Sequence, residues 1–320
     1  MIENSLVVVG AFLLDSLLGD PYTWPHPVKL IGNSIAFLDN FIQKNIKNKQ
    51  VKYVAGLFLW LIIVLGTGLV TITLLKVATS IHPVIGLLVS LYLSYTTLAM
   101  KSLAFEGKKM IKVLKEGSLE EARKQVGMIV GRDTSELNKK EICQATIETI
   151  AENTNDGMIA PLFYLVIGGP VLGMMYKAVN TLDSMVGYKN KKHLEVGAVS
   201  AILDDVFSFI PARITWLLMM LLSFILPFDG RNAVKIGWRD RYNHKSPNSA
   251  FPEAVVAGAL GIQLGGTHLY HGVEVYKPTI GENLKAVDYE DIVKTNQLLY
   301  ETSFVALLIF STIKFMVMGN

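Results

Sequence analysis

Two long stretches of the chain contain no charged residue, and they constrain the fold more than any other feature. Residues 53–75 and residues 81–100 are both rich in large apolar side chains and free of Asp, Glu, Lys and Arg. A helix needs about 20 such residues to cross the roughly 30 Å of hydrocarbon in a bilayer. Both stretches therefore predict transmembrane helices.

Four further apolar stretches are each interrupted by a polar residue or by glycine. They are residues 5–18 with Asp15, 158–176 with Gly168-Gly169-Pro170, 206–228 with Arg213, and 304–318 with Lys314. The Gly-Gly-Pro interruption makes 158–176 a candidate re-entrant or broken segment, which a membrane tolerates where the backbone is buried in protein. The sequence thus predicts an all-α, polytopic integral membrane helical bundle with about five to six membrane segments and cytoplasmic helical connections.

The composition agrees with a lipid bilayer as the surrounding medium. Hydrophobic residues make up 51% of the chain and charged residues only 18%, more apolar than a soluble domain needs. The net charge of +3 is spread over connecting segments, so nucleic acid is not an expected partner. No Gly/Ser-rich or Pro-rich linker divides the chain, and residues 1–320 are expected to form one domain.

Local chemistry predicts two helix starts in the polar segment after residue 100. Ser118 with Glu121, and Asn138 with Glu141, have the spacing of a capping box. The second helix is expected to run from Lys139 to about residue 153.

On this second helix, polar side chains, two of them acidic, recur every four residues. Gln144, Glu148 and Glu152 share one face, where like charges repel each other. A Mg²⁺ ion would offset that repulsion, and Asn153 and Asp156 are near enough to add oxygen ligands. The alternative is a solvated helix face.

A second set of polar residues accompanies the later apolar segments. Asp204 and Asp205 precede the stretch that contains Arg213, and Asp183 follows Asn180 by three residues. An arginine in a membrane helix needs a partner or water. It either clamps a phosphate while the aspartates hold a metal ion, or it forms an internal salt bridge.

Three further features are candidates for binding or catalysis. Asp20 and His26 flank a proline-rich corner that holds the backbone rigid; a structural histidine is the simpler alternative. Arg132 precedes the capped helix, where an anion can bind, although a surface salt bridge is equally compatible. Gly265-Gly266 indicates close backbone packing or a phosphate nearby.

Several of these stretches occur in a fixed order that resembles one enzyme family. They are GDP…PHP at 19–27, VGRDT at 130–134, AEN…DG…P from 151, NTLDSMVGYK at 180–189 and DD…PAR at 204–213. The order continues through Asn248 to Gly265-Gly266. In these motifs the chain resembles adenosylcobinamide-phosphate synthase, the CbiB/CobD family of cobalamin biosynthesis.

The resemblance implies an ATP- and Mg²⁺-dependent amide ligase of the cytoplasmic membrane, with its active site facing the cytoplasm. It would join adenosylcobyric acid to aminopropanol phosphate or a related amino alcohol phosphate, in association with other late cobalamin-assembly enzymes. The motifs, together with side-chain chemistry, make Asp20, His26, Glu152, Asn153, Asp156, Asp183 and Arg213 candidate catalytic residues. Candidate nucleotide contacts are Arg132, Asn180, Lys189, Asn248, Gly265 and Gly266, and candidate metal ligands are Glu152, Asp156, Asp183, Asp204 and Asp205.

A transporter or channel for a corrinoid or a small ion is the alternative. Asp15 and Arg213 inside apolar segments, and a broken helix, also suit transport.

Overall fold

A computed structural model describes residues 2–21, 24–188, 190, 192–270 and 272–319. Contacts group the chain into two compact units. The first unit contains Met1–Ala99, Ala160–Ser208 and Ile309–Asn320, and the second contains Met100–Ile159 and Phe209–Leu308. The single domain expected from the sequence stays a prediction.

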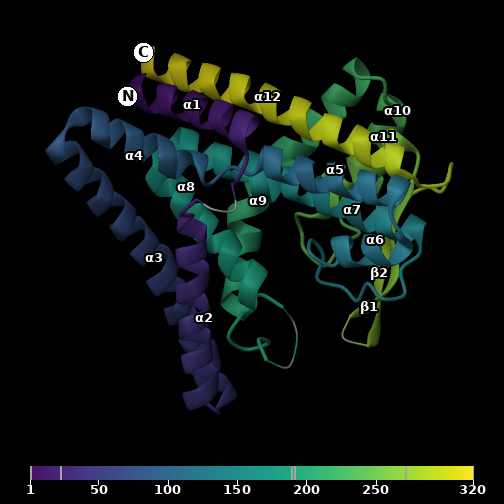
Figure 1. Ribbon diagram of the computed structural model, residues 1–320, viewed down its shortest axis with the longest axis horizontal. Helices are drawn as coiled ribbons and strands as arrows, with labels where there is room; N and C mark the ends of the chain where they lie inside the picture. The colour runs from purple at the N-terminus through teal and green to yellow at the C-terminus, as the bar shows by residue number, and fades with distance from the viewer. Residues whose placement is uncertain (1, 22–23, 189, 191, 271, 320) are drawn as a thin grey trace. The chain divides into compact units, whose positions relative to one another are not determined.

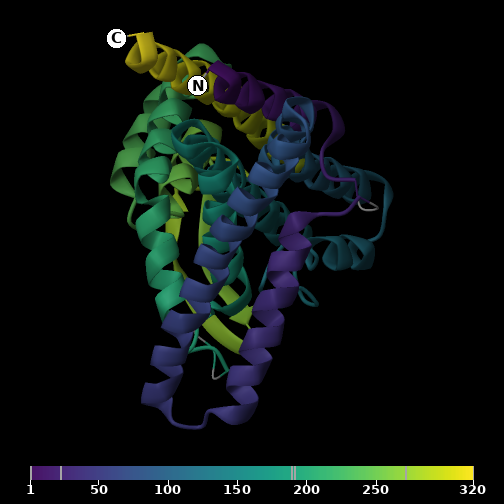
Figure 2. The same ribbon diagram turned by 90° about the vertical axis from the view of Figure 1, so that its left-hand side faces the viewer.

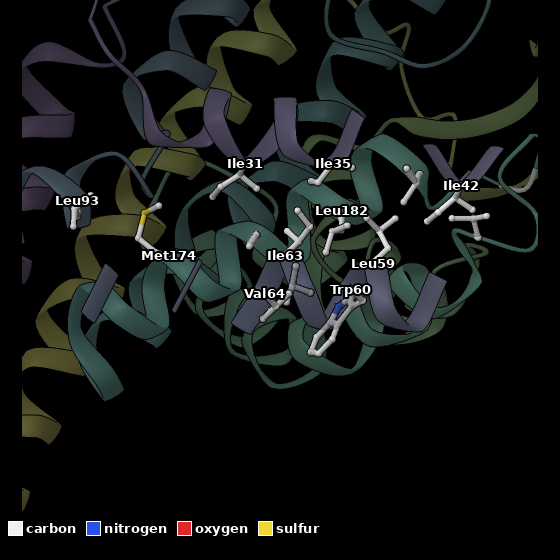
Figure 3. Close-up of a cluster of buried hydrophobic side chains, with 14 residues drawn as sticks. Ile31, Ile35, Ile42, Leu59, Trp60, Ile63, Val64, Leu93, Met174 and Leu182 are labelled. Carbon is white, nitrogen blue, oxygen red and sulfur yellow. The ribbon is translucent and has the colours of Figure 1, made fainter. Parts of the chain in front are cut away.

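In the described part of the first unit, all regular secondary structure is helical. Its helices are α1 (Ile2–Leu18), α2 (Pro27–Asn45), α3 (Lys49–Ile81), α4 (Pro83–Tyr95), α8 (Ala160–Val186), the start of α9 (Ala198–Ile225) and the end of α12 (Tyr289–Gly319). Figure 2 shows α2 and α3 as a long antiparallel hairpin. The core of this unit is formed where α2, α3 and α8 meet, by side chains such as Ile35, Leu59 and Leu182 (Figure 3).

Gly56 allows α3 to approach the chain that precedes α9. A Cβ atom on Gly56 would lie 2.2 Å from the carbonyl oxygen of Val196, which is closer than any carbon can approach. A larger residue at position 56 would therefore push the helix away from this segment.

Among the described residues, five helical stretches are long and apolar enough to cross a membrane. They are Lys49–Ile81, Pro83–Glu116, which includes α4 and α5 (Met100–Glu116), Lys139–Val186, which includes α7 (Lys139–Thr154), a π-helical turn and α8, Ala198–Ile225 and Tyr289–Val317, whereas Asn4–Leu18 is a shorter apolar helix. Side chains on α3 such as Ile62, Leu65 and Leu69 are more than half exposed, as expected where lipid covers the surface. The chain is a multi-pass membrane protein, and the predicted helical membrane fold is confirmed.

The predicted break in α8 is present. Gly168 and Gly169 leave the helical conformation, and Gly169 has a positive φ of 62°. The break releases carbonyl groups from the helix, and two side chains take them up. Asn4 Nδ2 donates to the carbonyl of Leu165 at 3.5 Å, and Lys314 Nζ donates to that of Val166. Each of these two carbonyl groups therefore has a side-chain donor despite the break.

A buried aspartate joins α2 to the segment before α9. Asp39 accepts from Gln43 at 3.2 Å and forms ion pairs with Lys192 at 3.0 Å and His193 at 3.2 Å. Gln43 in turn accepts from Lys52 at 2.7 Å. Burial raises the pKa of Asp39, but the hydrogen bonds from Lys192, Gln43 and His193 outweigh it and lower the pKa below 3.8. The folded protein thus favours the ionised carboxylate.

The variant Asp39→Asn should lower the free energy of unfolding by about 1–3 kcal/mol, because an ionised hydrogen-bond acceptor is lost. Since the folded-state pKa is depressed, the wild-type advantage is present above the ordinary pKa and is lost as the pH falls through the folded value. Thermal unfolding in detergent at several pH values would measure this. The exposed acid Glu120 provides the control variant Glu120→Gln, and an Asp39 effect that persists unchanged in acid would contradict the prediction.

The second unit combines helices with one β-hairpin. Its elements are α5 (Met100–Glu116), α6 (Leu119–Val126), α7 (Lys139–Thr154), a π-helical turn (Asn155–Ile159), the rest of α9, α10 (Gly230–Arg239), α11 (Ala250–Leu260), β1 (Gln263–Tyr270), β2 (Val273–Gly281) and most of α12. Both predicted capping boxes are present, at Ser118 with Glu121 and at Asn138 with Glu141. The antiparallel hairpin β1–β2, labelled in Figure 1, is the one sheet among the described residues and was not predicted.

Candidate functional site

The face of α7 that was predicted from spacing contacts the β-hairpin and the start of α11. Gln144 Nε2 donates to the carbonyl of Gln263 at 2.6 Å. One turn later Glu148 Oε1 accepts from the backbone N–H of Gly265 at 2.8 Å. The alternative interpretation, a helix face exposed to solvent along its whole length, therefore does not hold for Gln144 and Glu148.

The third member of that face, Glu152, is hydrogen-bonded to Ser249, the residue that immediately precedes α11. Its Oε1 accepts from the hydroxyl of Ser249 at 2.7 Å. Each polar side chain of the α7 face thus has a partner outside α7, on β1 or beside the start of α11.

Arg132 and Glu148 form a buried ion pair beside the hairpin. Arg132 Nη2 donates to Glu148 Oε2, and the two side chains are only 4% and 8% exposed. Arg132 Nη1 lies 2.9 Å from Nε2 of His268 on β1. Because arginine can only donate, His268 Nε2 must accept and the imidazole is neutral. Burial and, to a smaller extent, the charge of Arg132 lower the pKa of His268, which also favours the neutral imidazole.

Further charged residues lie near this ion pair. Burial raises the pKa of Glu253 on α11 well above 4.5, and the charges of Glu152 and Glu148 add to the effect. Burial alone would lower the pKa of Lys277 on β2, but nearby carboxylates, Glu148 first, raise it. Burial lowers the pKa of His244, whose Nδ1 accepts from the backbone of Ser246 at 3.0 Å.

These groups form what we call the charge cluster. It consists of Arg132, Glu148, Glu152, His244, Glu253, His268 and Lys277, all in the second unit. Titratable groups gather in this way at active sites more often than elsewhere. The charge cluster is the strongest candidate for a functional site among the described residues.

Gly265 shapes the edge of the charge cluster. Its φ is +75°, and a Cβ atom would lie 2.5 Å from the carbonyl oxygen of Pro278. The pairing register shifts between Leu264 and Gly266, so a bulge directs the Gly265 N–H at Glu148. Of the two expectations for Gly265-Gly266, close backbone packing is present at Gly265 but not at Gly266, where an added Cβ would meet nothing within 4 Å, and contact with a phosphate stays a prediction.

Arg213 is held by aromatic rings and amide oxygens. Its guanidinium lies 3.5 Å from the ring centre of Phe209 and 4.1 Å from that of Phe251. It donates to Asn248 Oδ1 at 2.5 Å and to the carbonyl of Pro247 at 3.2 Å. Within the described part of the chain Arg213 forms no ion pair, so the predicted alternative of an internal salt bridge is wrong. Its role as a phosphate contact stays a prediction.

The predicted corner in the first unit brings two candidates together. His26 Nε2 lies 3.2 Å from Asp20 Oδ1. The corner is tied to α4, because the hydroxyl of Tyr95 donates to the carbonyl of Gly19 and that of Tyr92 to Pro25. This confirms that the corner has fixed partners, and any catalytic role of Asp20 and His26 stays a prediction.

The other predicted residues of the first unit lie on two helices. Asn180 and Asp183 are near the end of α8, and Asp204 and Asp205 are in the first turns of α9. Asp183 lies against Gly187, where a Cβ atom would be 1.9 Å from its Oδ1. Lys189 falls outside the described residues.

The five predicted metal ligands are divided between the two units. Glu152 and Asp156 belong to the second unit, and Asp183, Asp204 and Asp205 to the first. Within each set of described residues, no three His, Cys, Asp or Glu side chains form a group that could hold a metal ion. Asp156 accepts from Asn155 at 2.6 Å and Asn153 donates to the Thr149 carbonyl at 2.9 Å. The shared metal site stays a prediction.

Four members of the charge cluster were not predicted at all as site residues, and Glu148 was predicted only as part of the α7 face. His244, Glu253, His268 and Lys277 lie in the loop before α11, in α11 itself and in the hairpin. The one signal for Glu253 was an acidic residue inside an apolar run, 252–260, which normally excludes a charge unless it serves a purpose.

Comparisons with known proteins match nearly the whole chain. Residues 8–299 match the family described as CobD/Cbib protein. Cobalamin biosynthesis protein CobD of Streptococcus sanguinis is 56% identical over 96% of both chains, and the protein of that name from Listeria monocytogenes serotype 4b is 54% identical over 96% of this chain and 98% of its own. Cobalamin biosynthesis protein CbiB of Salmonella choleraesuis is 46% identical over 94% of both. No solved structure matches.

The family match covers residues 8–299, and the first relative is 56% identical over 96% of the chain. The chain belongs to the CobD/CbiB family.

Proposed function

We propose that the protein is the adenosylcobinamide-phosphate synthase of cobalamin biosynthesis, an ATP-dependent ligase that joins a carboxylate of adenosylcobyric acid to the amine of aminopropanol phosphate. The curated relatives are named cobalamin biosynthesis proteins, which supports a role in that pathway. The observation that carries the finer proposal is the charge cluster, because amide ligation needs acids, bases and cations in one desolvated place.

The proposed reaction has two steps. The substrate carboxylate attacks the γ-phosphate of ATP and becomes an acyl phosphate while ADP leaves. The amine then attacks the acyl carbon, the amide forms, and phosphate leaves with the proton that the nitrogen loses. The cations Arg132 and Lys277 are suited to offset phosphate charge, and Glu152 is suited to orient a metal ion.

Mg²⁺ fits the residues of the second unit in this scheme. When bound to a nucleotide, the ion neutralises phosphate charge, and it needs only one or two protein carboxylates because phosphates and water supply the other ligands. Glu152 and Asp156, four residues apart, are the carboxylates of this unit that we assign to it, and Asp183, Asp204 and Asp205 of the first unit stay candidate ligands. Glu152 uses only Oε1 for Ser249, so its second oxygen is suited to a ligand.

We further propose that the site faces the cytoplasm. The polar segment after residue 100, which belongs to the same unit as the charge cluster, carries the basic residues Lys108, Lys109, Lys112 and Arg123, and such residues favour the cytoplasmic side of a membrane. Association with other late cobalamin-assembly enzymes at this face belongs to the same proposal.

Transport of a corrinoid or a small ion is the second candidate, and the break at Gly168-Gly169 favours it. Broken helices line the binding sites of many transporters. The break here is bonded to Asn4 and Lys314, which gives it a structural reason that does not require transport.

One experiment separates the two functions. Purified protein in detergent, given adenosylcobyric acid, ATP, Mg²⁺ and aminopropanol phosphate, should form the amide and release ADP, and sealed vesicles should accumulate no labelled corrinoid. Corrinoid uptake by the vesicles without amide formation in detergent would establish the transporter instead.

A further inference from the structure

Two members of the charge cluster have no direct partner for their charged ends in the part of the chain that the structure describes. Glu253 is 4% exposed, and its carboxyl takes part in no hydrogen bond or ion pair among the described residues. Lys277 is half-buried, and its ammonium likewise forms no ion pair with a described carboxylate. Buried acids and cations are normally paired or hydrogen-bonded. The raised pKa of Glu253 is that of a carboxyl with no described cation in contact, and a bound ammonium group would favour its ionised form.

The two groups lie on α11 and on the β-hairpin, both of which contact the acidic face of α7. Glu253 lies on α11, one turn after Ser249, whose hydroxyl donates to Glu152. Lys277 lies on β2 and pairs across the hairpin with Gly266, the residue after the Gly265 whose N–H donates to Glu148. Their neighbours have other partners. Glu148 is bound to Arg132 and to Gly265, and Glu152 is bound to Ser249.

We propose that Glu253 and Lys277 bind the two ends of one small dipolar substrate, with the carboxylate of Glu253 holding an ammonium group and the ammonium of Lys277 holding a phosphate group. This assignment rests on the proposed function and names the pocket for its amine substrate. A molecule that carries one ammonium and one phosphate would supply a partner of opposite charge to each of the two groups.

The assignment also explains why Arg132 is a less suitable phosphate ligand for this substrate. Its guanidinium already donates to Glu148 and to His268. The amine end of a substrate beside Glu253 would remain within the buried cluster, where a carboxylate binds a cation more strongly than in water.

Direct binding to the full chain in detergent, without ATP or corrinoid, tests the proposal by isothermal titration calorimetry. Three probes are needed: 1-aminopropan-2-ol phosphate, 1-aminopropan-2-ol, which lacks the phosphate, and isopropyl phosphate, which lacks the amine. The variant Lys277→Met should weaken binding of the two phosphates by roughly 10–100-fold and leave the amino alcohol unchanged. Glu253→Gln should weaken binding of the two amines by a similar factor and leave isopropyl phosphate unchanged.

Matched controls are available on the surface of the same unit. Lys124→Met and Glu274→Gln remove exposed charges and should leave all three affinities unchanged, and Lys277→Arg should restore binding of the phosphates. If both cluster variants weaken all three probes equally, or neither weakens any, the proposal is overturned.

A measurement on the wild type keeps the test independent of variant folding. The amino alcohol and isopropyl phosphate should each compete with 1-aminopropan-2-ol phosphate for binding, but they should not compete with each other. Mutual competition between the amino alcohol and isopropyl phosphate would overturn the two-ended site. If the wild type forms the amide but Lys277→Met and Glu253→Gln do not each weaken only their own probes, this inference alone is rejected. If the variants behave as expected but no amide forms, the ligase is rejected and the binding site is retained.

Discussion

Replacing Arg132 with methionine is expected to lower the free energy of unfolding by about 3–5 kcal/mol, because it leaves the carboxylate of Glu148 buried without its cation. The side chains of the pair are 4% and 8% exposed, so water cannot replace the guanidinium. His268 would lose the donor to its Nε2 in the same step. Denaturant unfolding of the purified protein in detergent, followed by the fluorescence of Trp216 and Trp238 in the second unit, measures this loss.

A double variant shows whether the loss comes from the unpaired charge. Arg132→Met combined with Glu148→Gln removes both charges and should recover much of the stability, because an amide is far less costly to bury than a lone carboxylate. Arg231→Met, at an exposed position, is the control. A double variant that is no more stable than Arg132→Met would contradict the explanation.

Features that depend on neighbours in sequence were predictable. The capping boxes at Ser118 and Asn138 act over three residues, and both are present. The membrane helices follow from composition, since an uncharged stretch of that length has no other stable environment. The break at Gly168-Gly169 was also evident, because two glycines before a proline disfavour a continuous helix.

The β-hairpin was missed because nothing local requires it. Strand β1 contains Gly265 and Gly266, which weaken a strand, and its residues do not alternate between apolar and polar. The hairpin is fixed instead by distant partners. Asp133 N donates to the carbonyl of Leu269 at 2.9 Å, and Gly272 N donates to Asp133 at 2.7 Å.

Only the part of the candidate site that lies on one helix could be predicted, because its other residues are distant in sequence. The α7 face could be found because Gln144, Glu148 and Glu152 follow the helical repeat. His268 lies 136 residues after Arg132, and the pairing of Gly265 with Glu148 spans 117 residues. Spacing along one helix carries no information about such partners, so Glu253 and Lys277 could not be grouped with the acidic face before the fold was known.

The variants Glu152→Gln, Asp183→Asn and Asp205→Asn are each expected to reduce ligase turnover at least about 100-fold, because a site that binds Mg²⁺ and transfers a phosphoryl group depends on oriented negative charge. The amides keep the size and shape of the side chains and remove only the charge. Turnover of the purified variants over a range of Mg²⁺ concentrations measures the effect, with Glu136→Gln as an exposed control.

The pattern among the three variants decides which unit holds the metal ion. If all three lose activity and higher Mg²⁺ restores part of it, acidic residues of both units contribute to one site. If Glu152→Gln alone is impaired, the metal belongs to the charge cluster of the second unit, and the aspartates of α8 and α9 have another purpose. Wild-type turnover in all three at saturating Mg²⁺ would reject the metal assignment, because a carboxylate that binds a catalytic cation cannot be replaced by an amide without loss of affinity or rate.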